Sequence, residues 1–154
     1  ETDYIKRIVG LPGDKIQVRE GVLYINDKVV ERVRTEDYEY WNRYGEFVKY
    51  AQYVETLPNG RSYKVLDATP FRLEPGSLDN TSVYVVPEGH YFGMGDNRDN
   101  SQDSRVLGSV GYIPEENLVG RAEILFFSTN GSARLWEVWR WPFSIRFYRL
   151  GNLL

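Results

Sequence analysis

Short runs of alternating apolar and polar residues, separated by turn residues, make up much of this chain. The first runs lie at residues 3–10, 15–18, 22–25 and 28–33. The turns between them contain residues that favour tight turns, namely Pro12, Gly13, Gly21 and Asn26. Alternation with a period of two places successive side chains on opposite faces of a strand. The pattern therefore predicts β-strands joined by tight turns.

The pattern continues through the rest of the chain. Residues 47–55 and 61–67 flank the sequence Leu-Pro-Asn-Gly at 57–60, which is typical of a hairpin turn. Further strands are expected at 82–86 and 118–127. Residues 35–44 are acidic and aromatic, and they fit either a loop or a short helix.

Composition favours an all-β fold and narrows the function. Aromatic residues make up 15% of the 154 residues, and such side chains are enriched in strands. A net charge of −3 gives no basic surplus for binding phosphates, so no nucleic-acid partner is expected. No run of roughly 18 apolar residues predicts a membrane-spanning helix.

The apolar strand at residues 91–94 leads into a polar stretch at 95–105, which reads GDNRDNSQDSR. Such a run is usually a solvated loop. It does not fit a calcium loop, because Arg98 stands where a ligand is needed when counting from Asp96. It does not fit a phosphate-binding loop either, because no Lys-Ser/Thr pair follows Gly93 and Gly95. We therefore expect no metal ion and no cofactor.

The stretch at 95–105 resembles the C-terminal signature of type I signal peptidases. A second stretch, residues 3–14, reads DYIKRIVGLPGD and is similar to the family's box that contains the catalytic lysine. Residues 117–121 also resemble the family, so the likeness extends to about Phe127. Two independent motifs in the family's order support the assignment.

The resemblance implies an all-β signal-peptidase/LexA-like fold. Its catalytic core would consist of residues 1–14 plus 89–154, incomplete at its N-terminal side, with an inserted β-rich lobe at 15–88. The implied activity is that of a membrane-associated serine endopeptidase. It would remove signal peptides from exported preproteins by a Ser–Lys dyad.

By resemblance, Lys6 is the general base and Ser101 orients its amine. A lysine amine accepts a proton only when it is neutral, and an apolar environment lowers the pKa of such an amine. Tyr4 and Met94 are expected to exclude water from it. The backbone of residues 3–6, with Asp3 and Ile5, would form one wall of the cleft, where an extended substrate could pair with it.

The other charged residues of the two motifs are expected to support this site. By resemblance, Arg7 pairs with Asp96, and Asp103 pairs with Arg105. Pairs of this kind position a site more than they stabilise a fold.

The chain departs from the family in one respect. The family's nucleophile lies in a Ser-x-Met-x-Pro-like box before the lysine box, and no such motif occurs in this chain. We expect the nucleophile and a membrane anchor to precede residue 1, and residues 1–154 alone to be inactive. The resemblance implies a location at the inner (plasma) membrane, with the catalytic domain on the periplasmic side. The aromatic C-terminal region at 135–148 is expected either to pack on the core or to contact the membrane surface.

Three alternatives fit parts of the pattern. A conjugal-transfer-type processing peptidase shares the fold and the chemistry. LexA-like self-cleaving repressors share the fold without a large inserted lobe. A non-catalytic β-rich binding module could retain a decayed peptidase site.

Overall fold

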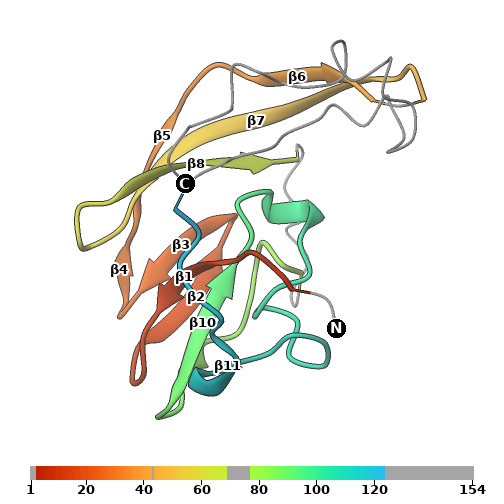
Figure 1. Cartoon of the computed structure of the whole chain (residues 1–154). Coiled ribbons are helices and arrows are strands. Elements are labelled where there is room, and N and C mark those ends of the chain that lie inside the picture. Colours follow the sequence, from red (N-terminus) through yellow and green to blue (C-terminus); the bar gives the residue numbers. More distant parts are fainter. Residues whose placement is uncertain (1–2, 43, 69–76, 124–154) are drawn as a thin grey trace, which may run out of the picture. The chain divides into compact units, whose positions relative to one another are not determined.

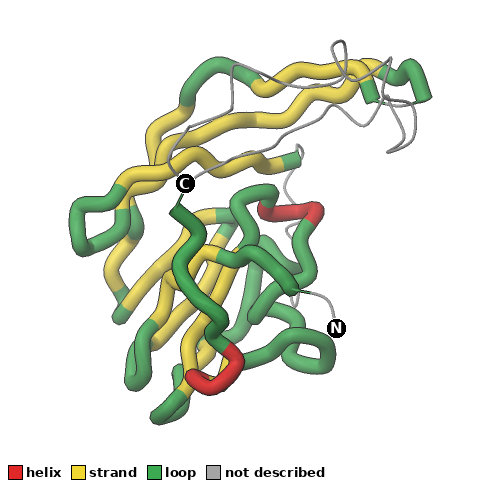
Figure 2. The backbone as a smooth tube through the Cα atoms, in the orientation of Figure 1, coloured by secondary structure: helices red, strands yellow, loops and turns green. Residues whose placement is uncertain are grey.

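The computed structural model describes residues 3–42, 44–68 and 77–123. In this part of the chain it contains eleven β-strands and two short 3-10 helices, which confirms the predicted all-β fold (Figures 1 and 2). None of the helices described has the length and apolar character needed to cross a membrane.

The first sheet brings the two sequence motifs together. Its strands, in spatial order, are β1 (Arg7–Gly10), β10 (His90–Met94) and β11 (Ile113–Pro114). The pairing of β1 with β10 is antiparallel and sets Arg7 opposite Met94. The strand predicted at 3–10 begins at Arg7, and residues 3–6 precede it without strand pairing.

The second sheet is built from hairpins. Its strands, in spatial order, are β4 (Lys28–Val29), β3 (Val22–Ile25), β2 (Lys15–Arg19) and β9 (Tyr84–Val85). The two turns within it contain residues with positive φ, at Glu20, Gly21, Asn26 and Asp27. Positive φ at both central residues suits the right-handed twist of paired strands. The predicted turns are therefore confirmed.

The third sheet is built around one long strand. It contains β5 (Glu31–Arg34), β6 (Tyr38–Trp41), β7 (Phe47–Thr56) and β8 (Ser62–Asp67), and β7 pairs with each of the other three. The predicted hairpin turn at 57–60 joins β7 to β8. Its Gly60 has a φ of 81° and donates its N–H to the Leu57 carbonyl at 2.8 Å.

Three sequence-based predictions need correction. Residues 38–41 form β6, because they pair with β7, where the sequence predicted a loop or a short helix. The strand predicted at 28–33 is divided at Val30, which is buried and still donates its N–H to Leu23 of the preceding hairpin. Residues 118–123 form no strand, because among the described residues no neighbouring strand pairs with them. Residues 124–127 of that predicted strand lie outside the described part.

The core joins strands from all three sheets. Its fully buried side chains include Ile16, Leu23, Val65 and Phe92. Three of these four residues come from the expected inserted lobe, and Phe92 comes from the expected catalytic core. The division at residues 15 and 88 stays a prediction.

The chain divides into two compact units. Residues 3–40 and the described parts of 48–118 belong to one unit, and residues 41–47 and 119–123 belong to the other. In the second unit, the Asn42 side-chain oxygen accepts the N–H groups of Tyr44 and Glu46 at 2.9 and 3.0 Å, which fixes the turn between β6 and β7.

Candidate active site

A lysine amine and a serine hydroxyl from distant parts of the chain meet in the first unit. Lys6 directly precedes β1, and Ser101 follows the 3-10 helix η1 (Arg98–Asn100). The Lys6 Nζ lies 3.1 Å from the Ser101 Oγ across a separation of 95 residues. Both side chains are half-buried. The predicted contact is therefore present, and it arises from the pairing of β1 with β10.

Two glycines allow this close approach. A Cβ atom on Gly95 would lie 2.1 Å from the Ser101 Oγ, which no real contact permits. A Cβ atom on Gly93 would lie 2.8 Å from the Ile113 side chain and 3.1 Å from the Lys6 Cβ. Larger residues at these two positions would displace the hydroxyl and the lysine stem.

An ion pair joins the two motifs beside the lysine. The Arg7 Nε and Nη2 donate to the two carboxylate oxygens of Asp96, each at 2.8 Å. These hydrogen bonds to the Asp96 carboxylate raise the pKa of the Arg7 guanidinium above its ordinary value. A bidentate pair fixes direction as well as distance. It therefore orients β1 relative to the start of the signature loop, residues 95–105.

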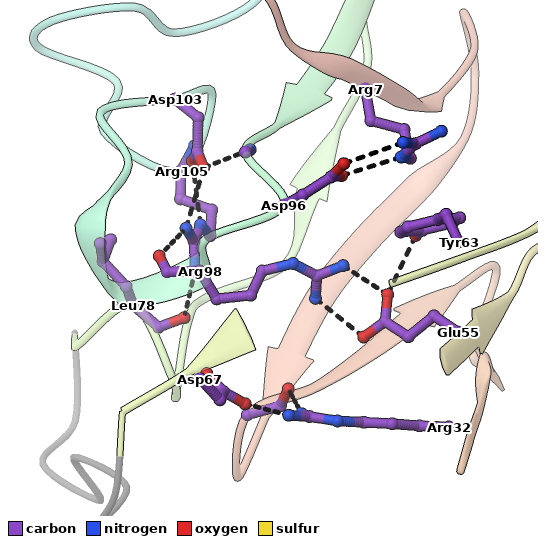
Figure 3. A network of polar contacts seen from close by, with 12 residues as sticks. Arg7, Arg32, Glu55, Tyr63, Asp67, Leu78, Asp96, Arg98, Asp103 and Arg105 are labelled. Atoms are coloured by element: carbon purple, nitrogen blue, oxygen red, sulfur yellow. Dashed lines mark hydrogen bonds and ion pairs between the residues drawn. The ribbon is translucent and has the colours of Figure 1, made fainter. Parts of the chain in front are cut away.

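A second ion pair closes the signature loop. The Arg105 Nε and Nη2 donate to Asp103 at 2.9 and 2.8 Å, and the Gly95 N–H donates to the Asp103 Oδ2 at 2.9 Å (Figure 3). Burial opposes ionisation of Asp103, but Arg105 and these N–H donors hold the pKa of its carboxyl below the ordinary value. Ser104 is buried, and its hydroxyl accepts the Gly93 N–H at 2.9 Å. Asp103, Ser104 and Arg105 are therefore buried and hydrogen-bonded, whereas Asn100 and Gln102 of the same loop are exposed.

The remaining predicted residues differ in their exposure. Met94 is buried in the hydrophobic core. The Tyr4 side chain is 73% exposed, and its ring centroid lies 5.9 Å from the Lys6 Nζ. Tyr4 therefore gives the amine less shielding from water than the sequence predicted. Asp3 and Ile5 are exposed, as the wall of an open cleft requires, but their contact with substrate stays a prediction.

Sequence reasoning missed three residues beside this site. Glu55 of β7 and Arg98 of η1 form a buried ion pair, and the Tyr63 hydroxyl donates to the same Glu55 at 2.9 Å. The Tyr63 ring also lies 4.1 Å below the Arg7 guanidinium. The sequence signal for Glu55 was its charge at an inward-facing position of a strand with alternating apolar and polar residues.

One group of carboxylates has spacing suited to a cation. Oxygen atoms of Asp67, Asp79 and Asp99 lie within 4.8 Å of one another. Arg32 forms an ion pair with Asp67, which supplies one positive charge to the group. Burial, and the neighbouring charge of Asp99, raise the pKa of Asp67 to about 6 against the opposing effect of Arg32. This group is distinct from the contact between Lys6 and Ser101.

The contact between Lys6 and Ser101 defines a class of site. A lysine amine within hydrogen-bond distance of a serine hydroxyl, on rigid backbone, is typical of serine hydrolases that use a lysine as the general base. The chain belongs to the signal peptidase family, peptidase S26, whose family model matches residues 1–127.

Relatives of known name agree with this family. The chain is 49% identical over 129 residues to a signal peptidase I of Rickettsia typhi, and 50% identical over 129 residues to that of Rickettsia prowazekii. Each alignment covers 82% of this chain and 47% of the relative, so the chain spans about half the length of the relatives that it matches. A crystal structure of a signal peptidase I from Enterococcus faecalis V583 is 25% identical, with a TM-score of 0.37. That comparison covers 75% of this chain and 78% of the other.

Proposed function

We propose that the protein to which these residues belong is a membrane-associated serine endopeptidase that removes signal peptides from exported preproteins. The observation that supports this most directly is the distance of 3.1 Å between the Lys6 Nζ and the Ser101 Oγ, in a chain of the signal peptidase family. Lys6 is the general base of the proposed reaction, and Ser101 orients its amine. The nucleophile is a serine outside residues 1–154.

The proposed chemistry follows the logic of other serine hydrolases. The neutral amine of Lys6 takes the proton of the nucleophilic serine as its oxygen bonds to the scissile carbonyl carbon. The proton then passes to the leaving amine as the peptide bond breaks, and water hydrolyses the acyl-enzyme. The hydrogen bond to Ser101 matters because a lysine stem has many rotamers, and the hydroxyl selects one of them.

The proposed substrate site is the exposed side of the segment before β1. Residues 3–6 lead into β1 without strand pairing among the described residues, and in the proposed function an extended peptide pairs with this segment. Ile5 is 76% exposed in this segment. Small pockets here would select the small residues that precede a signal-peptide cleavage site.

The proposed setting is the inner (plasma) membrane, with the catalytic domain on the extracytoplasmic side. The partners are signal peptides and the membrane surface, and no nucleic acid is involved. Contact with the membrane through the aromatic C-terminal region stays a proposal, because residues 135–148 lie outside the described part of the chain.

The test is cleavage of a preprotein by the product of the full-length gene. We expect cleavage at the signal-peptide junction, and we expect Ser101→Ala to lower kcat by about 10- to 100-fold through loss of the amine's orientation. Ser109→Ala is the matched control, because Ser109 is exposed and lies in a turn after the signature loop. Cleavage at unrelated sites, or equal effects of the two substitutions, would refute the proposal.

A further inference from the structure

A fully buried carboxylate lies in the third sheet, outside both sequence motifs. Glu55 belongs to β7, and its exposed fraction is 0%. Burying an ionised carboxylate is costly unless charged and hydrogen-bonding partners surround it. Its partners therefore indicate why it is there.

Both oxygens of Glu55 are used. The Arg98 Nη1 donates to Oε1 at 2.9 Å, and the Arg98 Nη2 donates to Oε2 (Figure 3). The Tyr63 hydroxyl donates to the same Oε2 at 2.9 Å. Burial, together with the negative charge of Glu55, raises the pKa of Tyr63 far above its ordinary value, so its hydroxyl stays a donor. Glu55 thus binds two residues of different segments.

The first partner, Arg98, connects Glu55 to the segment that contains Ser101. Arg98 begins η1, three residues before Ser101, and its carbonyl accepts a hydrogen bond from Arg105. Arg105 in turn pairs with Asp103, which accepts the N–H of Gly95. These contacts enclose the turn in which the Ser101 hydroxyl lies.

The second partner, Tyr63, connects Glu55 to the segment that contains Lys6. The Tyr63 ring lies 4.1 Å from the guanidinium carbon of Arg7, the residue next to Lys6. A guanidinium stacked on an aromatic face is attracted by the ring and confined in orientation. Arg7 is also held by Asp96 at 2.8 Å. Glu55 therefore contacts the segment that contains Ser101 directly, at Arg98, and reaches the segment that contains Lys6 through Tyr63.

We infer that Glu55 is a positioning residue for the contact between Lys6 and Ser101. Through Arg98 and Tyr63 it sets the distance between the two segments. This inference rests on the proposed function. A buried ion pair of this kind adds little net stability compared with an apolar replacement, so its geometric effect is the property to measure.

The test uses Glu55→Gln in the product of the full-length gene. The amide cannot accept both donors of Arg98, so we expect kcat for signal-peptide cleavage to fall about 100-fold, as for a small misplacement of a catalytic group. We expect KM to stay within about twofold, because the substrate-binding edge does not contact Glu55. Glu31→Gln, an exposed change on the neighbouring strand β5, should leave both constants unchanged.

A double variant separates positioning from simple stability. Glu55→Gln with Arg98→Met removes both buried charges, so the midpoint of thermal unfolding should recover relative to Glu55→Gln alone. We expect kcat not to recover with it. Recovery of kcat together with the midpoint would show that Glu55 is merely structural and would overturn the inference.

A spectroscopic measurement is independent of cleavage. In protein labelled with ¹⁵N-lysine, Glu55→Gln should shift or broaden the Lys6 Nζ signal, and Glu31→Gln should not. An unchanged Lys6 signal in Glu55→Gln would contradict the inference. Absence of signal-peptide cleavage, with a Lys6 signal that still responds to Glu55→Gln, would contradict the proposed function alone. If Glu55→Gln does not fold, Tyr63→Phe gives the same test, with a fall in kcat of about three- to tenfold for one lost hydrogen bond.

Discussion

The first unit contains two groups of ion pairs that differ in burial. Around the signature loop, Glu55 with Arg98 and Asp103 with Arg105 are almost wholly buried. At the β6–β7 edge, the Lys49 amine lies 2.8 Å from Asp37 and 3.0 Å from Glu39, but the Lys49 side chain is 55% exposed. The distances are similar, whereas the surroundings are not.

Distance alone does not determine what an ion pair contributes to stability or to function. Water screens the exposed pairs and competes for their hydrogen bonds, so these pairs contribute little to the stability of the fold. The buried pairs have no such competition, and removal of one partner leaves an uncompensated charge. The buried pairs lie beside Lys6 and Ser101, so we expect function to depend on them and not on the exposed group.

The largest effect is expected for Asp103→Ala. It leaves the buried Arg105 without its carboxylate and the Gly95 N–H without its acceptor, so the free energy of unfolding should fall by about 3–5 kcal/mol. Urea denaturation measures this fall. A loss below about 1 kcal/mol would show that the buried pair resembles the exposed one.

The next effect concerns pH. The pKa of Asp67 is about 6 in the folded protein and near 3.8 in an ordinary carboxyl, so the folded state binds this proton more tightly. Its contribution to stability is complete below about pH 4 and is lost as pH rises through about 6. The stability of the native chain relative to Asp67→Asn should therefore fall by up to about 3 kcal/mol over this range. Asp27→Asn, on an exposed turn, should show no such change. A difference in stability between the native chain and Asp67→Asn that does not vary with pH would contradict the prediction.

A smaller effect on stability is expected for Gly95→Ala. The added methyl group overlaps the Ser101 hydroxyl, so the loop must shift at a cost of about 1–3 kcal/mol, and cleavage should fall with the displacement of Ser101. Gly108→Ala is the matched control, because no atom lies within 4 Å of the added Cβ. Thermal unfolding and cleavage rates measure both consequences. Equal behaviour of the two variants would contradict the close approach at Gly95.

The smallest effect is expected for Lys49→Ala. The hydrogen bond from Lys49 lowers the pKa of Asp37, but Lys49 is exposed and Asp37 is only half-buried, so water screens the pair. Thermal unfolding should show no change beyond measurement error. A loss comparable to that of Asp103→Ala would remove the distinction between the two groups.

The sequence predicted the residues of the site better than the residues that hold them in place. Lys6 and Ser101 could be named because each lies in a motif, and their family likeness predicted that they meet. Glu55 has an inward-facing position in its alternating strand, but the strand pattern does not identify its partner. Arg98 lies 43 residues further along the chain, and no local pattern reports that contact.

The strands were predictable where turn chemistry was strong. Leu57–Gly60 and the two turns of the second sheet were recognised from their residues. Strand β6 was not, because aromatic and acidic residues fit several local structures, and pairing with β7 decides among them.

The most direct test of the central claim compares two lysines. Lys6→Met and Lys49→Met each remove one amine and keep an unbranched apolar stem. In the product of the full-length gene, Lys6→Met should lower kcat for signal-peptide cleavage by about 10²–10⁴-fold, the usual contribution of a general base, and Lys49→Met should leave it unchanged. Near-native cleavage by folded Lys6→Met protein would contradict the account.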